Sequence, residues 1–327
     1  MGTNGGHDGL VSGPLRTDDV IDATEPPATE PEIEITPSRE AQIGAAVVRR
    51  SLPTRARRTV GAWCFLDHAP AARVDGGGGM QVGPHPHTGL QTVTWLLAGE
   101  VVHTDSLGSE QLIRPGQLNL MTAGHGVVHA EKMPSSYRGD VHAVQLWVAQ
   151  PERTRDGEAA FAHHSELPKV EIGSATATVL IGSLGEVTSP ARRDTDHFGV
   201  DLELRTGPTV LPLNPGHEHA VVVLDGELSI GERALAPDQL VYLGSRRDEL
   251  EFVAHTPARA LLLGGTPFEA RPLMWWNFVA RTQAEIDEAY EAWQAGSDRF
   301  GPVASTLPLV PAPPPLWRTK GQPFVAR

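Results

Sequence analysis

The sequence predicts an all-β protein made of two tandem β-barrels, with one short helix near its C-terminus. From Ala45 onward, short runs rich in Val, Leu and Trp alternate with Gly, Pro, Asp and Asn, a spacing typical of strands in sandwiches and barrels. Long helical periodicity is scarce, and one pattern of strands and turns occurs twice. With 327 residues, the chain is long enough for two domains that each have an apolar core.

Residues 1–44 are rich in Gly, Pro, Thr, Asp and Glu and contain few large apolar side chains. Such a stretch buries too little apolar surface to offset the entropy that its backbone loses on becoming ordered. We therefore expect a disordered acidic tail over residues 1–44.

An internal repeat of strand, turn, strand, turn and strand indicates the two barrels. In the first copy, residues 96–101 (LLAGEV) carry the first turn and residues 114–118 (RPGQL) the second. In the second copy, residues 223–228 (VLDGEL) and 236–240 (APDQL) carry the same turns. A repeat of this kind predicts two copies of one small β-barrel, one in each half of the chain.

One helix is predicted at the end of the second barrel, which we place at residues 166–298. Thr282 stands three residues before Glu285, as in the capping box of a helix N-terminus, and Gly296 is a stop signal. The apolar face of this helix comprises Ile286, Tyr290 and Trp293. Residues 299–327 are rich in proline, so we expect an extended tail over the body of the protein, with docking to a proline-recognising partner as the less favoured alternative.

Two pairs of potential metal ligands lie in the first barrel, which we place at residues 45–165. One residue separates His85 from His87, and one residue separates His129 from Glu131. Side chains at i and i+2 of a strand point to the same face, so the two pairs can bring three nitrogens and one carboxylate together inside a barrel. A lone histidine is usually an ordinary core or surface residue, but two matched pairs favour a metal site. This ligand set suits a first-row transition metal better than Ca²⁺ or Mg²⁺.

The second barrel contains a similar pair, His217 and His219, but in a different register. His87 precedes the turn glycine Gly99 by twelve residues, whereas His219 precedes Gly226 by only seven. The positions that match the four ligand positions of the first barrel are Pro212, Asn214, Glu251 and Val253. We therefore predict a second barrel without metal, with His217 and His219 on a loop.

Charge and composition exclude several classes of function. With a formal net charge of −13 and a pI near 5.5, the chain shows no basic patch for nucleic acid or an anionic membrane. The single cysteine, Cys64, cannot form an internal disulfide, which favours a reducing compartment. The N-terminus has no apolar signal region, and no segment approaches a transmembrane span, so we expect a cytoplasmic protein.

Six segments, in order along the first barrel, match one known family. They are residues 84–97 (PHPHTGLQTVTWLL), 103–108 (HTDSLG), 114–116 (RPG), 121–124 (MTAG), 128–131 (VHAE) and 145–148 (QLWV). The chain thereby resembles the pirins, which are bicupins of the cupin superfamily. The resemblance implies an all-β fold of two tandem cupin (jelly-roll) β-barrels, of which the N-terminal one binds iron. It assigns the iron ligands to the residues that strand geometry also favours: His85, His87, His129 and Glu131.

Two residues depart from the common pirin pattern. Gln91 stands where pirins commonly have Glu, and His125 stands where they commonly have Arg. Gln91 lies four residues after His87, where many cupins place a carboxylate ligand, and an amide competes poorly for such a metal. Glu131 must then supply the carboxylate. His125 could act as an acid, base or hydrogen-bond donor at the pocket, but we favour an exposed loop position.

Further polar and aromatic residues carry weaker signals. His103 and Asp105 share a strand face and could form a pair behind the metal ligands, although an ordinary polar face also explains them. For Trp147, Trp275 and Trp276 we favour a place in the core and the domain interface over a platform for the substrate.

The resemblance implies an oxygenase that cleaves flavonols such as quercetin by 2,3-dioxygenation. Fe²⁺ is the expected cofactor, with other divalent first-row metals as alternatives, and a small aromatic or enol molecule and dioxygen are the expected substrates. Glu131 would serve both as a ligand and as the base for the substrate hydroxyl. Two alternatives stay open: an iron-dependent redox-sensing regulator that binds a protein partner, and a barrel that keeps its metal only for stability.

Overall fold

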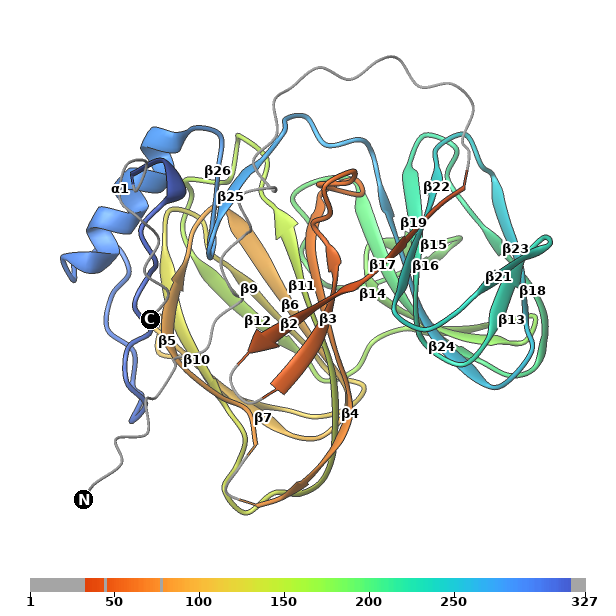
Figure 1. Cartoon of the computed structure of the whole chain (residues 1–327), viewed down its shortest axis with the longest axis horizontal. Helices are drawn as coiled ribbons and strands as arrows, with labels where there is room; N and C mark the ends of the chain where they lie inside the picture. Colours follow the sequence, from red (N-terminus) through yellow and green to blue (C-terminus); the bar gives the residue numbers. More distant parts are fainter. Residues whose placement is uncertain (1–32, 44–45, 77–78, 319–327) are drawn as a thin grey trace.

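A computed structural model of the chain describes residues 33–43, 46–76 and 79–318. Its strands form two barrels that lie side by side, and one α-helix packs on the outer side of the first barrel (Figure 1). This arrangement confirms the predicted all-β fold of two tandem barrels with one short helix. No helix in the described ranges is long and apolar enough to cross a membrane.

The first barrel consists of a seven-stranded and a four-stranded antiparallel sheet. Its strands are β2 (Arg39–Ile43), β3 (Ala46–Leu52), β4 (Trp63–Asp75), β5 (Gln81–His87), β6 (Leu90–Ala98), β7 (Val101–Asp105), β8 (Glu110–Ile113), β9 (Leu118–Thr122), β10 (Val127–Lys132), β11 (Arg138–Ala149) and β12 (Ala160–His164). The larger sheet has the order β12-β9-β6-β11-β4-β3-β2, and the smaller sheet has the order β5-β10-β7-β8.

The second barrel repeats this pattern of one seven-stranded and one four-stranded sheet. Its strands are β1 (Glu34–Pro37), β13 (Lys169–Ile172), β14 (Ala175–Ile181), β17 (His197–Leu204), β18 (Gly207–Pro212), β19 (Glu218–Asp225), β20 (Leu228–Ile230), β21 (Arg233–Leu235), β22 (Gln239–Gly244), β23 (Glu249–Ala254) and β24 (Ala258–Gly265). The orders are β1-β22-β19-β24-β17-β14-β13 and β18-β23-β20-β21, so β18 and β23 correspond to β5 and β10. Two small hairpins complete the sheets: β15 (Ser183–Leu184) with β16 (Val187–Thr188), and β25 (Leu273–Trp275) with β26 (Phe278–Ala280).

The large sheets of the two barrels pack against each other through a shared apolar cluster. Trp63 and Trp95 of the first barrel are fully buried there among aliphatic side chains of the second. The indole N–H of Trp63 donates to the carbonyl oxygen of Phe198 at 2.9 Å, and that of Trp95 donates to the carboxylate of Asp201 at 3.1 Å. Because the tryptophans on β4 and β6 point toward the second barrel, their sequence neighbours point into the first.

Residues 34–43 form two strands, so the predicted disordered tail is wrong for this part of the stretch 1–44. β1 pairs with β22 of the second barrel, while β2 pairs with β3 of the first. Ile33 and Ile35 pack against the apolar interior of the second barrel. Main-chain hydrogen bonds to existing sheet edges therefore order a segment whose composition alone favours disorder. Residues 1–32 lie outside the described residues.

Helix α1 (Gln283–Gln294) begins as the sequence predicts, and Gly296 follows its last turn. The hydroxyl of Thr282, the N-cap, accepts a hydrogen bond from the N–H of Glu285 at 3.3 Å. Gly296 has a φ of +61° and its N–H donates to the carbonyl of Trp293. The chain then continues without regular structure to the short 3₁₀ turn η2 (Leu316–Arg318) and lies along the helix. Residues 319–327 are outside the described ranges.

The helix packs on the first barrel and not on the second, although the sequence places it at the end of the predicted second domain. Ile286 is buried in one cluster with Val128 of β10. The hairpin before the helix is joined to the first barrel by a hydrogen bond of 3.0 Å from the N–H of Val279 to the carbonyl of Thr88. An apolar helix face can pack on either barrel, and the local sequence does not specify which one.

Candidate metal centre

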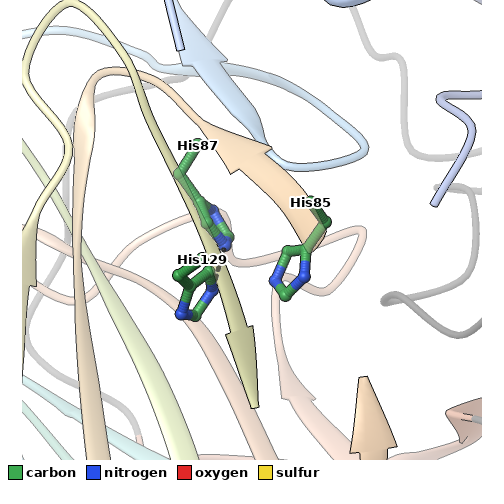
Figure 2. A group of neighbouring side chains, drawn as sticks. All are labelled: His85, His87 and His129. Atoms are coloured by element: carbon green, nitrogen blue, oxygen red, sulfur yellow. Dashed lines mark hydrogen bonds between the residues drawn. The ribbon is translucent and has the colours of Figure 1, made fainter. Parts of the chain in front are cut away.

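Strands β5 and β10 are neighbours and bring three histidines together inside the first barrel. His85 lies directly opposite His129 in the antiparallel pairing, and His87 lies two residues further along β5 on the same face. Figure 2 shows the three rings converging, with Nε2 of His87 3.0 Å from Nε2 of His129. One ring nitrogen from each histidine lies within 4.8 Å of the other two, and all three residues are buried.

The electrostatics of the three rings favour neutral imidazoles. Burial lowers the pKa of His85 to about 4, with the nearby His103 adding to the effect. Burial and the neighbouring histidines lower the pKa of His87 and of His129 well below the ordinary range. At neutral pH each ring therefore has one nitrogen with a free lone pair, which is the form that binds a metal.

The backbone of β5 fixes the tautomer of His85. Its Nδ1 lies 2.9 Å from the carbonyl oxygen of Gly83. A carbonyl can only accept, so Nδ1 carries the proton and Nε2 keeps its lone pair. Metal-bound histidines commonly donate their second nitrogen in this way. The three histidines thus fit a divalent first-row metal.

Glu131 lies two residues after His129 on β10 and is not in the group formed by the three histidines. Its carboxylate belongs to a second group of possible ligand atoms, within 4.8 Å of one another, with His103 and His129. The hydroxyl of Thr94 lies 3.3 Å from Glu131 Oε1. Burial raises the pKa of Glu131, although the charge of His103 and the hydrogen bond from Thr94 oppose the rise. Of the four predicted ligands, three histidines converge, and the carboxylate adjoins one of them.

His103 lies close to this centre, although its signal in the sequence is weak. Its Nδ1 lies 3.3 Å from Nδ1 of His129, and its Nε2 lies 3.0 Å from Oδ2 of Asp105. The signal was present in the alternation of His103 and Asp105 on one face of β7, the strand that pairs with β10. Which strand would lie beside β7 could not be read from local sequence.

A cavity of about 110 Å³ adjoins the histidines, and residues of strands β2 and β3 form part of its lining. Apolar side chains dominate its lining: Val48, Phe65, Leu96, Val144 and Trp147. Trp147 is therefore a wall of the cavity as well as a core residue, stacked on Phe65 with ring centres 4.0 Å apart. Trp275 and Trp276 are buried in the cluster around the helix. The polar lining beyond the predicted ligands comprises Asp67, Thr94 and Gln145.

The two residues that depart from the pirin pattern lie away from the cavity lining. Gln91 is buried and its amide N–H donates to the hydroxyl of Thr122 at 2.9 Å. His125 is exposed on the loop between β9 and β10, as expected.

The second barrel has an apolar interior at the corresponding strands. Pro212 and Glu251 are exposed, whereas inward positions of β18 and β23 are occupied by Leu211, Leu250 and Phe252. His219 is buried in β19, so its predicted loop position is wrong, because β19 starts one residue earlier at Glu218. Within the described ranges, the two side-chain groups that could hold a metal both belong to the first barrel.

Two barrels of this topology, with a histidine cluster inside one of them, define a bicupin with one candidate metal centre. Residues 45–148 match the family model for pirin, and residues 199–301 match the model for the pirin C-terminal cupin domain. The chain belongs to the pirin family.

Known relatives agree with this assignment. A Pseudomonas aeruginosa protein provisionally named quercetin 2,3-dioxygenase is 46% identical over 284 residues, covering 86% of this chain and 90% of that protein. A pirin-like protein of Caulobacter vibrioides is 34% identical, covering 79% of this chain and 92% of its own length. The crystal structure of quercetin 2,3-dioxygenase from Acinetobacter baumannii has a TM-score of 0.83 and 45% identity, covering 86% of this chain and 95% of that one.

Proposed function

We propose that this pirin is a metal-dependent dioxygenase that cleaves a flavonol such as quercetin, with Fe²⁺ as its metal. Three neutral imidazoles and a buried carboxylate beside a cavity with apolar walls carry this proposal. The names of the relatives at 46% and 45% identity support the choice of a flavonol and dioxygen as substrates.

His85, His87 and His129 would hold the metal through their nitrogen lone pairs, and Glu131 would supply the carboxylate. The chemistry that ferrous iron supplies when bound is the joint orientation of an enol substrate and dioxygen and the passage of electrons between them.

The other steps depend on the chain's own side chains. Glu131 accepts the proton of the substrate hydroxyl, and its raised pKa makes it a stronger base than an exposed carboxylate. Thr94, whose hydroxyl lies within 3.3 Å, orients that carboxylate. Phe65 and Trp147 provide flat apolar walls that contact an aromatic substrate and keep water away from it.

The test is metal content by elemental analysis of protein purified without oxygen, followed by oxygen uptake with quercetin, with His129→Ala as the control. We expect near-stoichiometric iron and quercetin-dependent uptake in the wild type, and loss of both in His129→Ala. Stoichiometric metal without uptake would refute the flavonol substrate, and a wild type without metal would refute the metal centre.

A further inference from the structure

A chain of hydrogen bonds leads from His129 to the loop that follows β7. Nδ1 of His129 lies 3.3 Å from Nδ1 of His103, and Nε2 of His103 lies 3.0 Å from Oδ2 of Asp105. All three side chains are buried. We propose that His103 and Asp105 are positioning residues that hold the proton of His129 on Nδ1 and leave Nε2 bare for the metal. This inference rests on the metal centre proposed above.

Asp105 determines which atom donates and which accepts in this series of hydrogen bonds. Its Oδ1 accepts hydrogen bonds from the backbone N–H groups of Leu107 and Ser109, both at 2.9 Å. These donors fix which oxygen faces the loop, so the other oxygen faces His103. Burial alone would raise the pKa of Asp105, but hydrogen bonds from His103 and Ser109 lower it overall, so the group is a carboxylate at neutral pH. A carboxylate only accepts, and Nε2 of His103 must therefore donate.

The tautomer of His129 follows from that of His103. With its Nε2 proton held by the Asp105 carboxylate, His103 can accept at Nδ1, and the facing Nδ1 of His129 then donates to it. Neutral His129 has one ring proton, which leaves a lone pair on Nε2. This is the nitrogen that faces His87 at 3.0 Å. Phe161 stacks on the ring of His103, with centres 4.4 Å apart and planes 14° apart, and holds that ring in place.

The substitution Asp105→Asn should reverse donor and acceptor in each of these hydrogen bonds. The amide oxygen retains the two loop N–H groups, so the amide nitrogen faces His103 and donates to its Nε2. The proton of His103 then moves to Nδ1, where it opposes the proton of His129 and drives that proton to Nε2. We expect affinity for Zn²⁺ to fall about 10- to 100-fold, the range found when the partner of a metal-bound histidine is changed.

Two independent measurements test the inference, one of the ring proton positions and one of the Zn²⁺ affinity. Proton–nitrogen correlation spectra of the histidine rings, taken before zinc is added, should show the His129 proton on Nδ1 in the wild type and on Nε2 in Asp105→Asn. Competition with a chelator should show the loss of Zn²⁺ affinity. His103→Phe removes the connecting ring but can still stack on Phe161, so Asp105→Asn should have no further effect in that background. Asp201→Asn, at an aspartate only 1% exposed between the barrels, is the matched control and should change neither readout.

Three outcomes would overturn the inference. The first is a wild-type His129 proton on Nε2, and the second is an equal loss of affinity from Asp105→Asn with and without His103. The third is a second equivalent of bound Zn²⁺, because His103, His129 and Glu131 would then surround a cation and not share a proton. A wild type that binds no Zn²⁺ would refute the proposed metal centre instead, and the ring proton positions would still decide the inference.

Discussion

Burial shifts the acid–base behaviour of single side chains in the first barrel in opposite directions. It lowers the pKa of His85 to about 4 and raises the pKa of Glu131, because each group loses the water that stabilises its charged form. The same loss of water therefore yields neutral imidazoles for a metal and a more basic carboxylate for a proton. Groups with opposed shifts in one cavity are typical of sites that transfer protons.

The proposed role of Glu131 as a base can be separated from its proposed role as a metal ligand. In Glu131→Gln the amide oxygen still occupies the site but cannot take up a proton. We expect turnover with quercetin to fall about 10²- to 10⁴-fold, with a smaller fall in iron content, because general-base catalysis contributes about that factor. Steady-state oxygen uptake and elemental analysis of the same preparation measure both effects. Equal losses of iron and turnover would rule out the base.

The buried ion pair of Arg50 and Asp67 next to the cavity should be costly to break from one side. The guanidinium Nε and Nη2 each lie 2.7 Å from a carboxylate oxygen, and both side chains are 2% exposed. Asp67→Leu alone would leave the charge of Arg50 buried, so we expect a loss of about 3–5 kcal/mol in the free energy of unfolding. Urea denaturation measures this loss.

The double variant Arg50→Met/Asp67→Leu tests the reason for that loss. It removes both charges at similar volume, so it should be clearly more stable than Asp67→Leu. A double variant less stable than the single one would mean that the unpaired charge of Arg50 does not cause the loss, because neither variant retains the attraction between the two charges.

Among the structural elements, those that depend on alternation along a strand were the most predictable. The spacing of His85 and His87, and of His129 and Glu131, placed each pair on one strand, and the structure has them on β5 and β10. The register shift between β10 and β5, which falls between His129 and Glu131, was not predictable, since register depends on the partner strand. After this shift, Glu131 lies in a group with His103 and His129, and not in the group that contains His85 and His87.

The segments that prediction missed are held by distant parts of the chain. Ile35 of β1 lies opposite Val241 of β22, more than 200 residues away in sequence. Composition describes what a segment can bury by itself, so it misses a strand that is ordered by pairing with an edge already formed.

The N-cap of α1 gives a prediction for a single element. Thr282→Ala removes the hydroxyl that accepts from Glu285, and we expect a loss of about 1 kcal/mol in stability. Thr282→Ser keeps the hydroxyl and should retain most of it. Hydrogen exchange of the α1 amides measures the change locally. Equal exchange in both variants would show that packing on the first barrel, and not the cap, sets the stability of the helix.

For the molecule as a whole, the interface between the barrels should respond to acid. Nε2 of His68 lies 2.8 Å from Nε2 of His142, and Nδ1 of His68 lies 3.3 Å from the carboxylate of Asp238 in the second barrel. Burial, then the neighbouring His68, lowers the pKa of His142 to about 4. Burial also lowers the pKa of His68, against the opposing effect of Asp238.

The sign of the pH effect follows from the unfolded state. An unfolded histidine has a pKa of about 6.5, whereas the pKa of His142 in the folded protein is about 4. Between these two pH values the side chain of His142 therefore binds more protons in the unfolded chain than in the folded one. The contribution of His142 is complete above about pH 6.5 and is lost as the pH falls toward 4. We expect His142→Gln to reduce the acid-induced loss of stability by on the order of 1–3 kcal/mol. Thermal unfolding from pH 7.5 to 4.5 measures this, and parallel curves for variant and wild type would contradict it.

The return of the chain to the first barrel bears on the order in which the protein can be completed during synthesis. The N–H of Val310 donates at 2.9 Å to the carbonyl of Pro84, next to His85. The ribosome makes the second barrel between these two residues. Strand β5 therefore gains this outer partner only after Val310 has been made, which follows the synthesis of the second barrel. A nascent first barrel can gather its histidines early, but their strand gains this support only after the second barrel has been made.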